Sequence, residues 1–204
     1  MKTRVKICGV TRVRDARLAV SLGASMIGCV MARDSKRRAT PAQAEAIVHA
    51  VGDSVPVVLV FRTATETEIV EACVRTGATT VQFHESAEAG YAQLEARGFR
   101  VIRVKQMPAG ARRLPMMKPS PRADRIYLLD SGLGGTGVTW NWKALGSRAP
   151  KHVFVAGGVN PENVKTLMKL KPYGVDLAGS VESAPGVKDA GKLRALFEAI
   201  GGAS

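Results

Sequence analysis

The sequence predicts an α/β protein in which eight parallel strands close into a (β/α)8 barrel, the TIM-barrel architecture. Short β-rich runs alternate with helix-start signals along the chain, which indicates a parallel sheet with helices in its crossovers. The runs number eight, the count that closes such a barrel, and 204 residues suffice for one compact barrel. A doubly wound open sheet would show the same alternation, so the strand count is what favours the barrel.

Each predicted strand is a short apolar run, and several begin just after a glycine that suits the end of a helix. LGASMIGCVM at 22–31 and YGVDLAGSV at 173–181 are examples. The predicted strands are, in chain order, Val5–Cys8, Met26–Val30, Val57–Phe61, Thr80–His84, Arg100–Lys105, Ile126–Asp130, Val153–Ala156 and Val175–Ala178.

Capping signals mark the starts of the helices. Thr40-Pro41-Ala42-Gln43 and Thr65-Glu66-Thr67-Glu68 are capping boxes, and Asn160-Pro161 pairs an N-cap with a proline at the first helical position. One connection departs from this plan, because QMPAGARRLPMMKPSP at 106–121 contains four prolines and no sustained helical period. We therefore expect the fifth helix to be shortened or replaced by a loop, within a single barrel domain that spans residues 1–204.

Composition and cysteine spacing exclude several classes of protein. The N-terminus lacks the long apolar segment of a secretory signal, and no run approaches the roughly 18 apolar residues needed to cross a bilayer. We therefore expect a cytoplasmic protein with no membrane partner. Cys8, Cys29 and Cys73 have no metal-like spacing, so no metal site is expected, and the last two should pack as small hydrophobic side chains.

The formal net charge of +13 makes nucleic acid a partner to consider. The basic residues are scattered over several segments, with no interleaved aromatic residues and no nucleic-acid motif. We therefore expect attraction for small anions and no specific nucleic-acid partner. A non-catalytic basic nucleic-acid binder is kept as an alternative function.

A glycine-rich segment follows the sixth strand. Gly132 to Gly137 satisfies the dinucleotide pattern G-x-G-x-x-G, but it comes late in the chain, and the next acid after Asp130 is Glu162. The dinucleotide motif needs an early βαβ unit and an acid about 20 residues on, so this segment does not favour NAD binding. Asp130, directly before the glycines, is the better indication of chemistry.

Side chains that can carry chemistry gather at the predicted carboxyl ends of the strands, where ligands bind in α/β folds. Alternation within strands puts Lys6 with Cys8, and Gln82 with His84, on common faces. Two glycine-containing loops follow the seventh and eighth strands, where barrels often bind phosphate through backbone N–H groups. The residues at this end are Cys8, Gln82, His84, Asp130, Asp176 and, in the two loops, Gly157, Gly158, Gly179 and Ser180.

Six segments resemble, in the same order and over nearly the whole chain, the phosphoribosylanthranilate isomerase family. They are VKICGVT at 5–11, SKRRATPAQA at 35–44, VQFHE at 81–85, LLDSGLGGTGVTWNW at 128–142, AGGVNPENV at 156–164 and GVDLAGSVESAPGVKD at 174–189. The resemblance implies a (β/α)8 barrel of tryptophan biosynthesis that catalyses the Amadori rearrangement of N-(5-phosphoribosyl)anthranilate to 1-(2-carboxyphenylamino)-1-deoxyribulose 5-phosphate. It also implies a phosphorylated small-molecule substrate, no metal or organic cofactor, and a monomer, although some members form homodimers.

Residue roles follow from the same resemblance. Cys8 would be the general base and Asp130 the general acid, and Arg37 would bind the anthranilate carboxylate. The remaining implied contacts are Lys6, Gln82, His84 and Asp176 for the substrate, Gly157, Gly158, Gly179 and Ser180 for the phosphate, and Gly134, Gly135, Thr136 and Gly137 for a loop that covers the site.

The chain departs from the family pattern at Glu85, Asn141 and Ala178-Gly179-Ser180. The last departure lies in a phosphate loop, so it bears on phosphate contacts. A related phosphosugar isomerase with an altered substrate, or with two substrates from histidine and tryptophan synthesis, is therefore a further alternative. The implied Cys8 base, and the lack of a glycine-rich phosphate loop after the third strand, speak against it.

Overall fold

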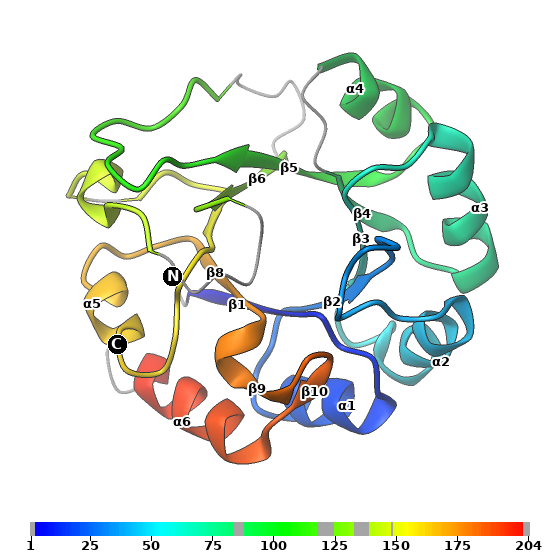
Figure 1. Cartoon of the computed structure of the whole chain (residues 1–204), viewed down its shortest axis with the longest axis horizontal. Helices are drawn as coiled ribbons and strands as arrows, with labels where there is room; N and C mark the ends of the chain where they lie inside the picture. Colours follow the sequence, from blue (N-terminus) through cyan, green and yellow to red (C-terminus); the bar gives the residue numbers. More distant parts are fainter. Residues whose placement is uncertain (1–2, 84–87, 118–124, 133–138, 148, 202–204) are drawn as a thin grey trace.

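The computed structural model describes residues 3–83, 88–117, 125–132, 139–147 and 149–201, and its centre is a closed barrel of eight parallel strands paired in chain order. Figure 1 shows the strands as a ring with helices outside it. The barrel strands are β1 Arg4–Cys8, β2 Met26–Val30, β3 Val57–Phe61, β4 Thr80–Phe83, β5 Arg100–Gln106, β6 Ile126–Asp130, β7 Val153–Val155 and β8 Gly174–Leu177. The barrel and all eight strands were predicted, with boundaries correct to one residue. His84, at the end of the fourth predicted strand, lies outside the described residues.

Helices cover the barrel unevenly. The first four strands are each followed by a helix of nine to eleven residues: α1 Val13–Ser21, α2 Pro41–Val51, α3 Glu66–Thr76 and α4 Glu88–Ala96. After β6 and β7 the described helices are shorter, namely the 3-10 helix η1 at Trp142–Leu145 and α5 Val164–Met168, whereas α6 Ala190–Gly201 at the end of the chain has 12 residues. Residues 107–117, which follow β5, contain no helix, which confirms the expected loss there. None of the described helices is long and apolar enough to cross a membrane.

The strands separate two packed layers of side chains. Outward-facing residues pack under the helices in one large cluster, and that cluster includes Cys29 and Cys73, as predicted. Inward-facing residues fill the barrel. The inner cluster consists of Cys8, Met26, Val58, Val60, Ile102, Val104, Ile126, Leu128, Phe154 and Ala156. These apolar members fill the middle of the barrel, with Gln82 and Asp176 toward its carboxyl end and Thr80 and Arg100 toward the other.

The two capping boxes form as the sequence predicts. In each, the threonine hydroxyl accepts a hydrogen bond from the N3 backbone N–H, and the N3 side chain accepts one from the threonine N–H. The third predicted helix start, Asn160-Pro161, does not begin a helix directly. Asn160 and Asn163 exchange side-chain-to-backbone hydrogen bonds of 2.8 and 2.9 Å, and α5 begins only at Val164. Pro161 therefore lies in a turn that precedes the helix.

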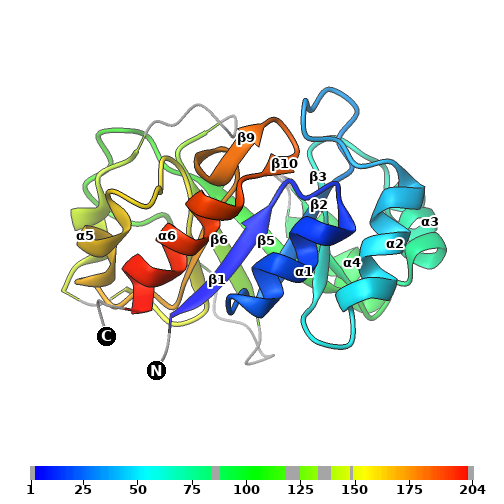
Figure 2. The same cartoon turned by 90° about the horizontal axis from the view of Figure 1, so that it is seen from below.

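A small hairpin that the sequence did not predict lies at the carboxyl end of the barrel. Its strands are β9, Glu182–Ala184, and β10, Val187–Lys188, which follow the 3-10 helix η2 at Gly179–Val181. Figure 2 shows the hairpin at the end toward which β1 points, near the start of α1. Thr11 donates a hydrogen bond of 2.6 Å to the Gly186 carbonyl, so the hairpin is fastened to the loop after β1.

Substitution of Gly174 tests how tightly the inner layer of the barrel is packed. A Cβ atom at this residue would lie 2.5 Å from the ring of Phe154, which packs inside the barrel. Gly174→Ala should therefore lower the free energy of unfolding by about 1–3 kcal/mol, the usual cost of overpacking. Denaturant unfolding followed by circular dichroism measures the change. Gly201→Ala is the control, because no atom lies within 4 Å of its Cβ position; equal effects of the two variants would contradict this account of the core.

Candidate active site

A cavity of about 530 Å³ opens at the carboxyl ends of the strands and brings together most of the residues singled out in the sequence. The predicted residues that line it are Cys8, Arg37, Gln82, Asp130, Asp176, Gly157, Gly158, Gly179 and Ser180. Lys6 lies on the same face of β1 as Cys8, one layer deeper, and is completely buried. His84 and the loop-cover residues 134–137 lie outside the described residues, as does Glu85.

Lys6 and Asp176 form an ion pair inside the barrel. The Lys6 Nζ lies 2.8 Å from Asp176 Oδ1, and the two residues are direct partners in the register of β1 with β8. Burial alone would lower the pKa of Lys6, but the charge of Asp176 and the nearby Cys8 raise it to about 12. Lys6 is therefore a fixed positive charge at the floor of the cavity.

The buried thiol of Cys8 has surroundings that shift its pKa in opposite directions. Burial raises the pKa of Cys8 above its ordinary value of 9.0, while the positive charge of Lys6 acts to lower it. The space beside the sulfur is narrow: a Cβ atom on Gly28 of the neighbouring strand would lie 2.9 Å from Cys8 Sγ. Only glycine at this position leaves the thiol in place.

Asp130 ends β6 and projects into the same cavity. Burial, together with the negative charge of Asp176, raises the pKa of Asp130 from 3.8 to about 6. Hydrogen bonds from the backbone N–H groups of Ser131 and Gly132 act in the opposite direction. Near neutral pH a minority of Asp130, but a far larger one than of an ordinary aspartate, therefore holds the proton that a general acid requires.

Gln82 supplies an unused acceptor. Its side chain is buried at the end of β4, and its Oε1 atom has no hydrogen-bond partner among the described residues. A buried polar atom is costly to leave unpaired, so this atom is available to a ligand in the cavity.

The loops after β7 and β8 meet at one side of the cavity. Gly157 and Gly158 have φ angles of +82° and +68°, and a Cβ on Gly157 would lie 2.4 Å from Ser131 Oγ, so the backbone conformation and the packing both require glycine. The Ser180 hydroxyl donates a hydrogen bond of 2.7 Å to the Val159 carbonyl, which joins the two loops. This position and composition suit an anion bound by main-chain N–H groups.

Arg37 reaches the cavity from the loop after β2. Its Nε atom donates to both carboxylate oxygens of Glu182, at 3.1 and 2.9 Å. The resemblance singled out Arg37 between the basic residues Lys36 and Arg38, and the structure places Arg37 on the cavity wall.

Sequence analysis missed several residues of the site. Gln106 and Arg62 line the cavity, and Glu182 and Lys188 lie behind Arg37. Inward alternation along β5, through Ile102 and Val104, could have identified Gln106. Glu182 and Lys188 gave no such signal, because their roles depend on a hairpin that the sequence did not predict. Among the described residues no group of acids, histidines or cysteines could hold a metal ion.

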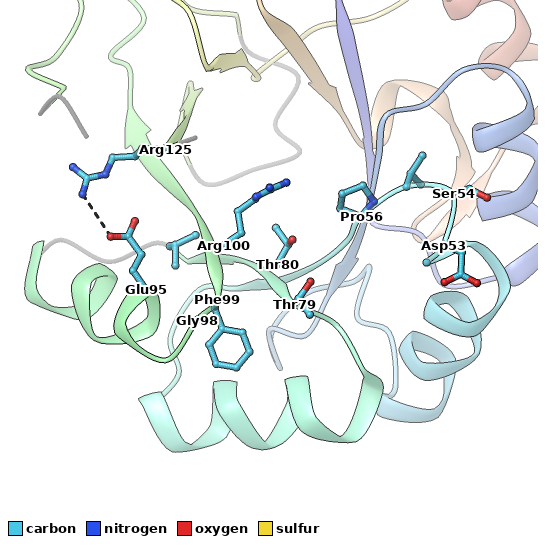
Figure 3. Close-up of a pocket in the computed structure, with 13 residues that line it drawn as sticks. Asp53, Ser54, Pro56, Thr79, Thr80, Glu95, Gly98, Phe99, Arg100 and Arg125 are labelled. Atoms are coloured by element: carbon cyan, nitrogen blue, oxygen red, sulfur yellow. Dashed lines mark ion pairs between the residues drawn. The ribbon is translucent and has the colours of Figure 1, made fainter. Parts of the chain in front are cut away.

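A second cavity, of about 400 Å³, lies at the opposite end of the barrel. Figure 3 shows its wall, where Glu95 and Arg125 face each other with 3.5 Å between Oε2 and Nη2. It is lined by the starts of β4 and β5 and by the segment before β3. Because ligands of this architecture bind at the carboxyl ends of the strands, we assign the candidate site to the first cavity.

Comparison with known proteins points to one family. Residues 5–199 match the sequence model of the family described as N-(5'phosphoribosyl)anthranilate (PRA) isomerase. A curated relative, N-(5'-phosphoribosyl)anthranilate isomerase of Stenotrophomonas maltophilia strain R551-3, is 35% identical over 210 residues, covering 98% of this chain and 93% of the relative.

Solved structures agree. Phosphoribosyl anthranilate isomerase from Thermus thermophilus superposes with a TM-score of 0.84 at 36% identity, covering 99% of this chain and 100% of the other. A phosphoribosyl anthranilate isomerase in complex with reduced 1-(o-carboxyphenylamino)-1-deoxyribulose 5-phosphate superposes with a TM-score of 0.78 at 26% identity, covering 98% and 99%.

The raised pKa of Asp130 predicts a pH-dependent cost to the fold. A group whose pKa is higher in the folded than in the unfolded protein favours folding most at low pH, and this contribution is lost as the pH rises through about 6. Asparagine does not titrate. Between pH 4 and pH 7.5 the wild type should therefore lose about 2 kcal/mol of unfolding free energy relative to Asp130→Asn.

Urea unfolding of both proteins at the two pH values measures this difference. Parallel pH dependence of the two proteins would show that Asp130 titrates normally and would remove the physical basis for its role as an acid.

Proposed function

This chain belongs to the N-(5'-phosphoribosyl)anthranilate (PRA) isomerase family, and from that premise we propose that it catalyses the Amadori rearrangement of N-(5-phosphoribosyl)anthranilate to 1-(2-carboxyphenylamino)-1-deoxyribulose 5-phosphate. The observation that carries the proposal is one cavity that holds both Cys8 and Asp130, with the pKa of Asp130 raised to about 6. An aldose-ketose isomerisation needs an acid and a base directed at one sugar, and these two residues supply them.

The substrate fits the cavity in one orientation. Its phosphate would bind the backbone of Gly157, Gly158, Gly179 and Ser180, where two glycine loops meet. Its anthranilate carboxylate would bind Arg37 on the neighbouring wall, because a guanidinium group matches a carboxylate in shape and charge. The ribose then lies between these contacts, with Gln82 and Asp176 as further contacts.

The reaction begins with opening of the sugar ring. Asp130 donates its proton to the furanose ring oxygen as the C1–O bond breaks, and the lone pair of the anthranilate nitrogen forms the C=N bond of a protonated imine. Burial keeps the proton on Asp130 available near neutral pH. The carboxylate that remains is stabilised by the N–H groups of Ser131 and Gly132.

The second step moves a proton from carbon to Cys8. The thiolate takes the proton from C2, the electrons form the C1=C2 bond of an enolamine, and the enolamine then rearranges to the ketone. Lys6 favours the thiolate, although burial makes the thiol the ground state in the free protein. Lys6 and Asp176 act here through charge: their ion pair holds a cation close to the sulfur.

Cys8 and Asp130 together hold one proton both in the resting protein and in the state that reacts. At neutral pH the resting pair is a Cys8 thiol with an Asp130 carboxylate, whereas catalysis needs a thiolate with a carboxylic acid. Both states hold one proton, so moving it costs free energy but involves no exchange with bulk solvent. This is the physical consequence of two pKa values that are both raised by burial.

Three further features complete the proposal. His84 would contact the substrate and residues 134–137 would cover it, both as sequence-based predictions. The protein would act in the cytoplasm, with residues 1–204 as one barrel domain. A monomer is the proposed state, since among the described residues only Val74 and Met116 are exposed large apolar side chains, too few for an apolar interface.

Replacing either reacting group should abolish turnover. We expect Cys8→Ala and Asp130→Asn to lower kcat by at least about 100-fold, the usual contribution of a general acid or base. The loss of anthranilate-type fluorescence from freshly made phosphoribosylanthranilate measures the rate. Cys29→Ala is the matched control, because Cys29 packs in the outer layer, and it should keep near-normal turnover. Near-normal turnover in Cys8→Ala or Asp130→Asn would contradict the assignment.

A folded wild type without this activity would favour the alternatives. Turnover of a different phosphosugar would indicate a related isomerase with an altered or second substrate. Retention of nucleic acid in a gel shift at physiological salt would indicate the nucleic-acid binder, whose affinity would fall steeply with added salt.

The shared proton predicts the pH dependence of kcat/KM. Below about pH 6 the pair holds two protons and the thiolate is lost; above the raised pKa of Cys8 it holds none and the acid is lost. Between these limits the one-proton state dominates, so kcat/KM should be nearly constant from about pH 6.5 to about pH 9. A continuous tenfold fall per pH unit above 6 would show instead that only Asp130 limits the reaction.

A further inference from the structure

The inference concerns how Arg37 is held, and it rests on the proposed function. Arg37 comes from a loop, so its aim toward a substrate carboxylate depends on its neighbours. Its Nε atom is bonded by Glu182, and the Glu182 side chain is almost completely buried. No other described residue accepts a hydrogen bond from Arg37, which leaves the Nη1–Nη2 edge of the guanidinium group for a ligand.

Two glycines fix the path of the same side chain. A Cβ atom on Gly9 would lie 2.8 Å from Arg37 Cδ, and a Cβ on Gly179 would lie 2.8 Å from Arg37 Nη2. Arg37 therefore runs through a passage whose walls are backbone, from the loop after β1 to the loop after β8. Within that passage Glu182 determines how the planar group is rotated.

Glu182 is itself held by a buried cation. Lys188 Nζ lies 2.8 Å from Glu182 Oε1, and the Lys188 side chain is completely buried. The same Nζ donates to the Cys8 carbonyl at 2.5 Å and to the Ala178 carbonyl at 3.1 Å, at the ends of β1 and β8. The N–H of Gly186 donates a further bond of 3.1 Å to Glu182. The carboxylate is thus fixed relative to the two strands that carry Cys8 and Asp176.

The charges of this cluster also leave Arg37 able to attract an anion. Arg37 and Lys188 share the single carboxylate of Glu182, so Glu182 does not neutralise Arg37 alone. A surface arginine needs no such buried support, and burying an ion pair costs desolvation energy that a structural contact could avoid. The arrangement is therefore better explained by orientation of Arg37 than by stability.

We propose that Glu182 is a positioning residue for Arg37: held in place by Lys188, it turns the free edge of the guanidinium group toward the carboxylate of the substrate's aromatic ring. Glu182 contacts no reacting atom in this account. Its contribution appears only with ligands that carry the ring carboxylate.

Two substitutions separate the charge of Glu182 from its reach. Glu182→Asp keeps the charge but shortens the side chain, and Glu182→Gln keeps the reach but removes the charge. The probes are reduced 1-(2-carboxyphenylamino)-1-deoxyribulose 5-phosphate and the same compound without the ring carboxylate, with Kd measured by calorimetry. We expect both variants to bind the carboxylate-bearing probe about 10-fold more weakly, the size of one charge-assisted contact, and the other probe within about 2-fold of wild type.

The double variant shows whether the effect passes through Arg37. In an Arg37→Met background Glu182→Asp should change the affinity for the carboxylate-bearing probe by less than about 2-fold, since residues that act as a unit are non-additive. Turnover gives a second readout: Glu182→Asp should raise KM about 10-fold and leave kcat within about 3-fold of wild type. Glu95→Asp shortens the partly buried partner of Arg103 outside the site and should leave both Kd values unchanged.

Two outcomes would overturn the inference alone: equal weakening of both probes by Glu182→Asp, which indicates a general structural role, or additive losses in the double variant. A wild type that binds neither probe would instead overturn the proposed function, and the inference with it.

Discussion

The ion pair between Lys6 and Asp176 is the interaction on which both the barrel and its site depend. It joins the first strand to the last, so it lies at the seam where the barrel closes. It also places a cation, with a pKa raised to about 12, next to the thiol of Cys8 and a carboxylate near Asp130. A polar pair at this depth is affordable only because both charges are satisfied together. The fold and the electrostatics of the cavity thus share one contact.

The same low-dielectric setting explains the contrast between the two proposed reacting groups. Burial raises the pKa of Cys8 and of Asp130 alike, which helps an acid and hinders a base. The nearby cation compensates on the thiol side only. A second group of charges, in which Arg37 and Lys188 share Glu182, lies at the other wall. Buried charges therefore lie behind both sides of the cavity: Lys6 and Asp176 on one side, and Glu182 and Lys188 on the other.

Most of the fold followed from the sequence, because strand runs, glycine stops and capping boxes are local patterns. The lack of a helix in the described residues 107–117 followed from the prolines there for the same reason. The hairpin at 182–188 did not, since its strands are two and three residues long and have no period to detect. At the site, inward alternation placed Lys6, Cys8 and Gln82 together. Arg37 followed from the family resemblance and not from a local pattern, because a loop between basic neighbours has no fixed period to say which side chain faces the cavity.

The first and last described elements begin and end away from the cavity. Strand β1 begins, and helix α6 ends, at the end of the barrel opposite the β9–β10 hairpin (Figure 2). A second protein attached at either end would therefore leave the mouth of the cavity open to diffusing substrate.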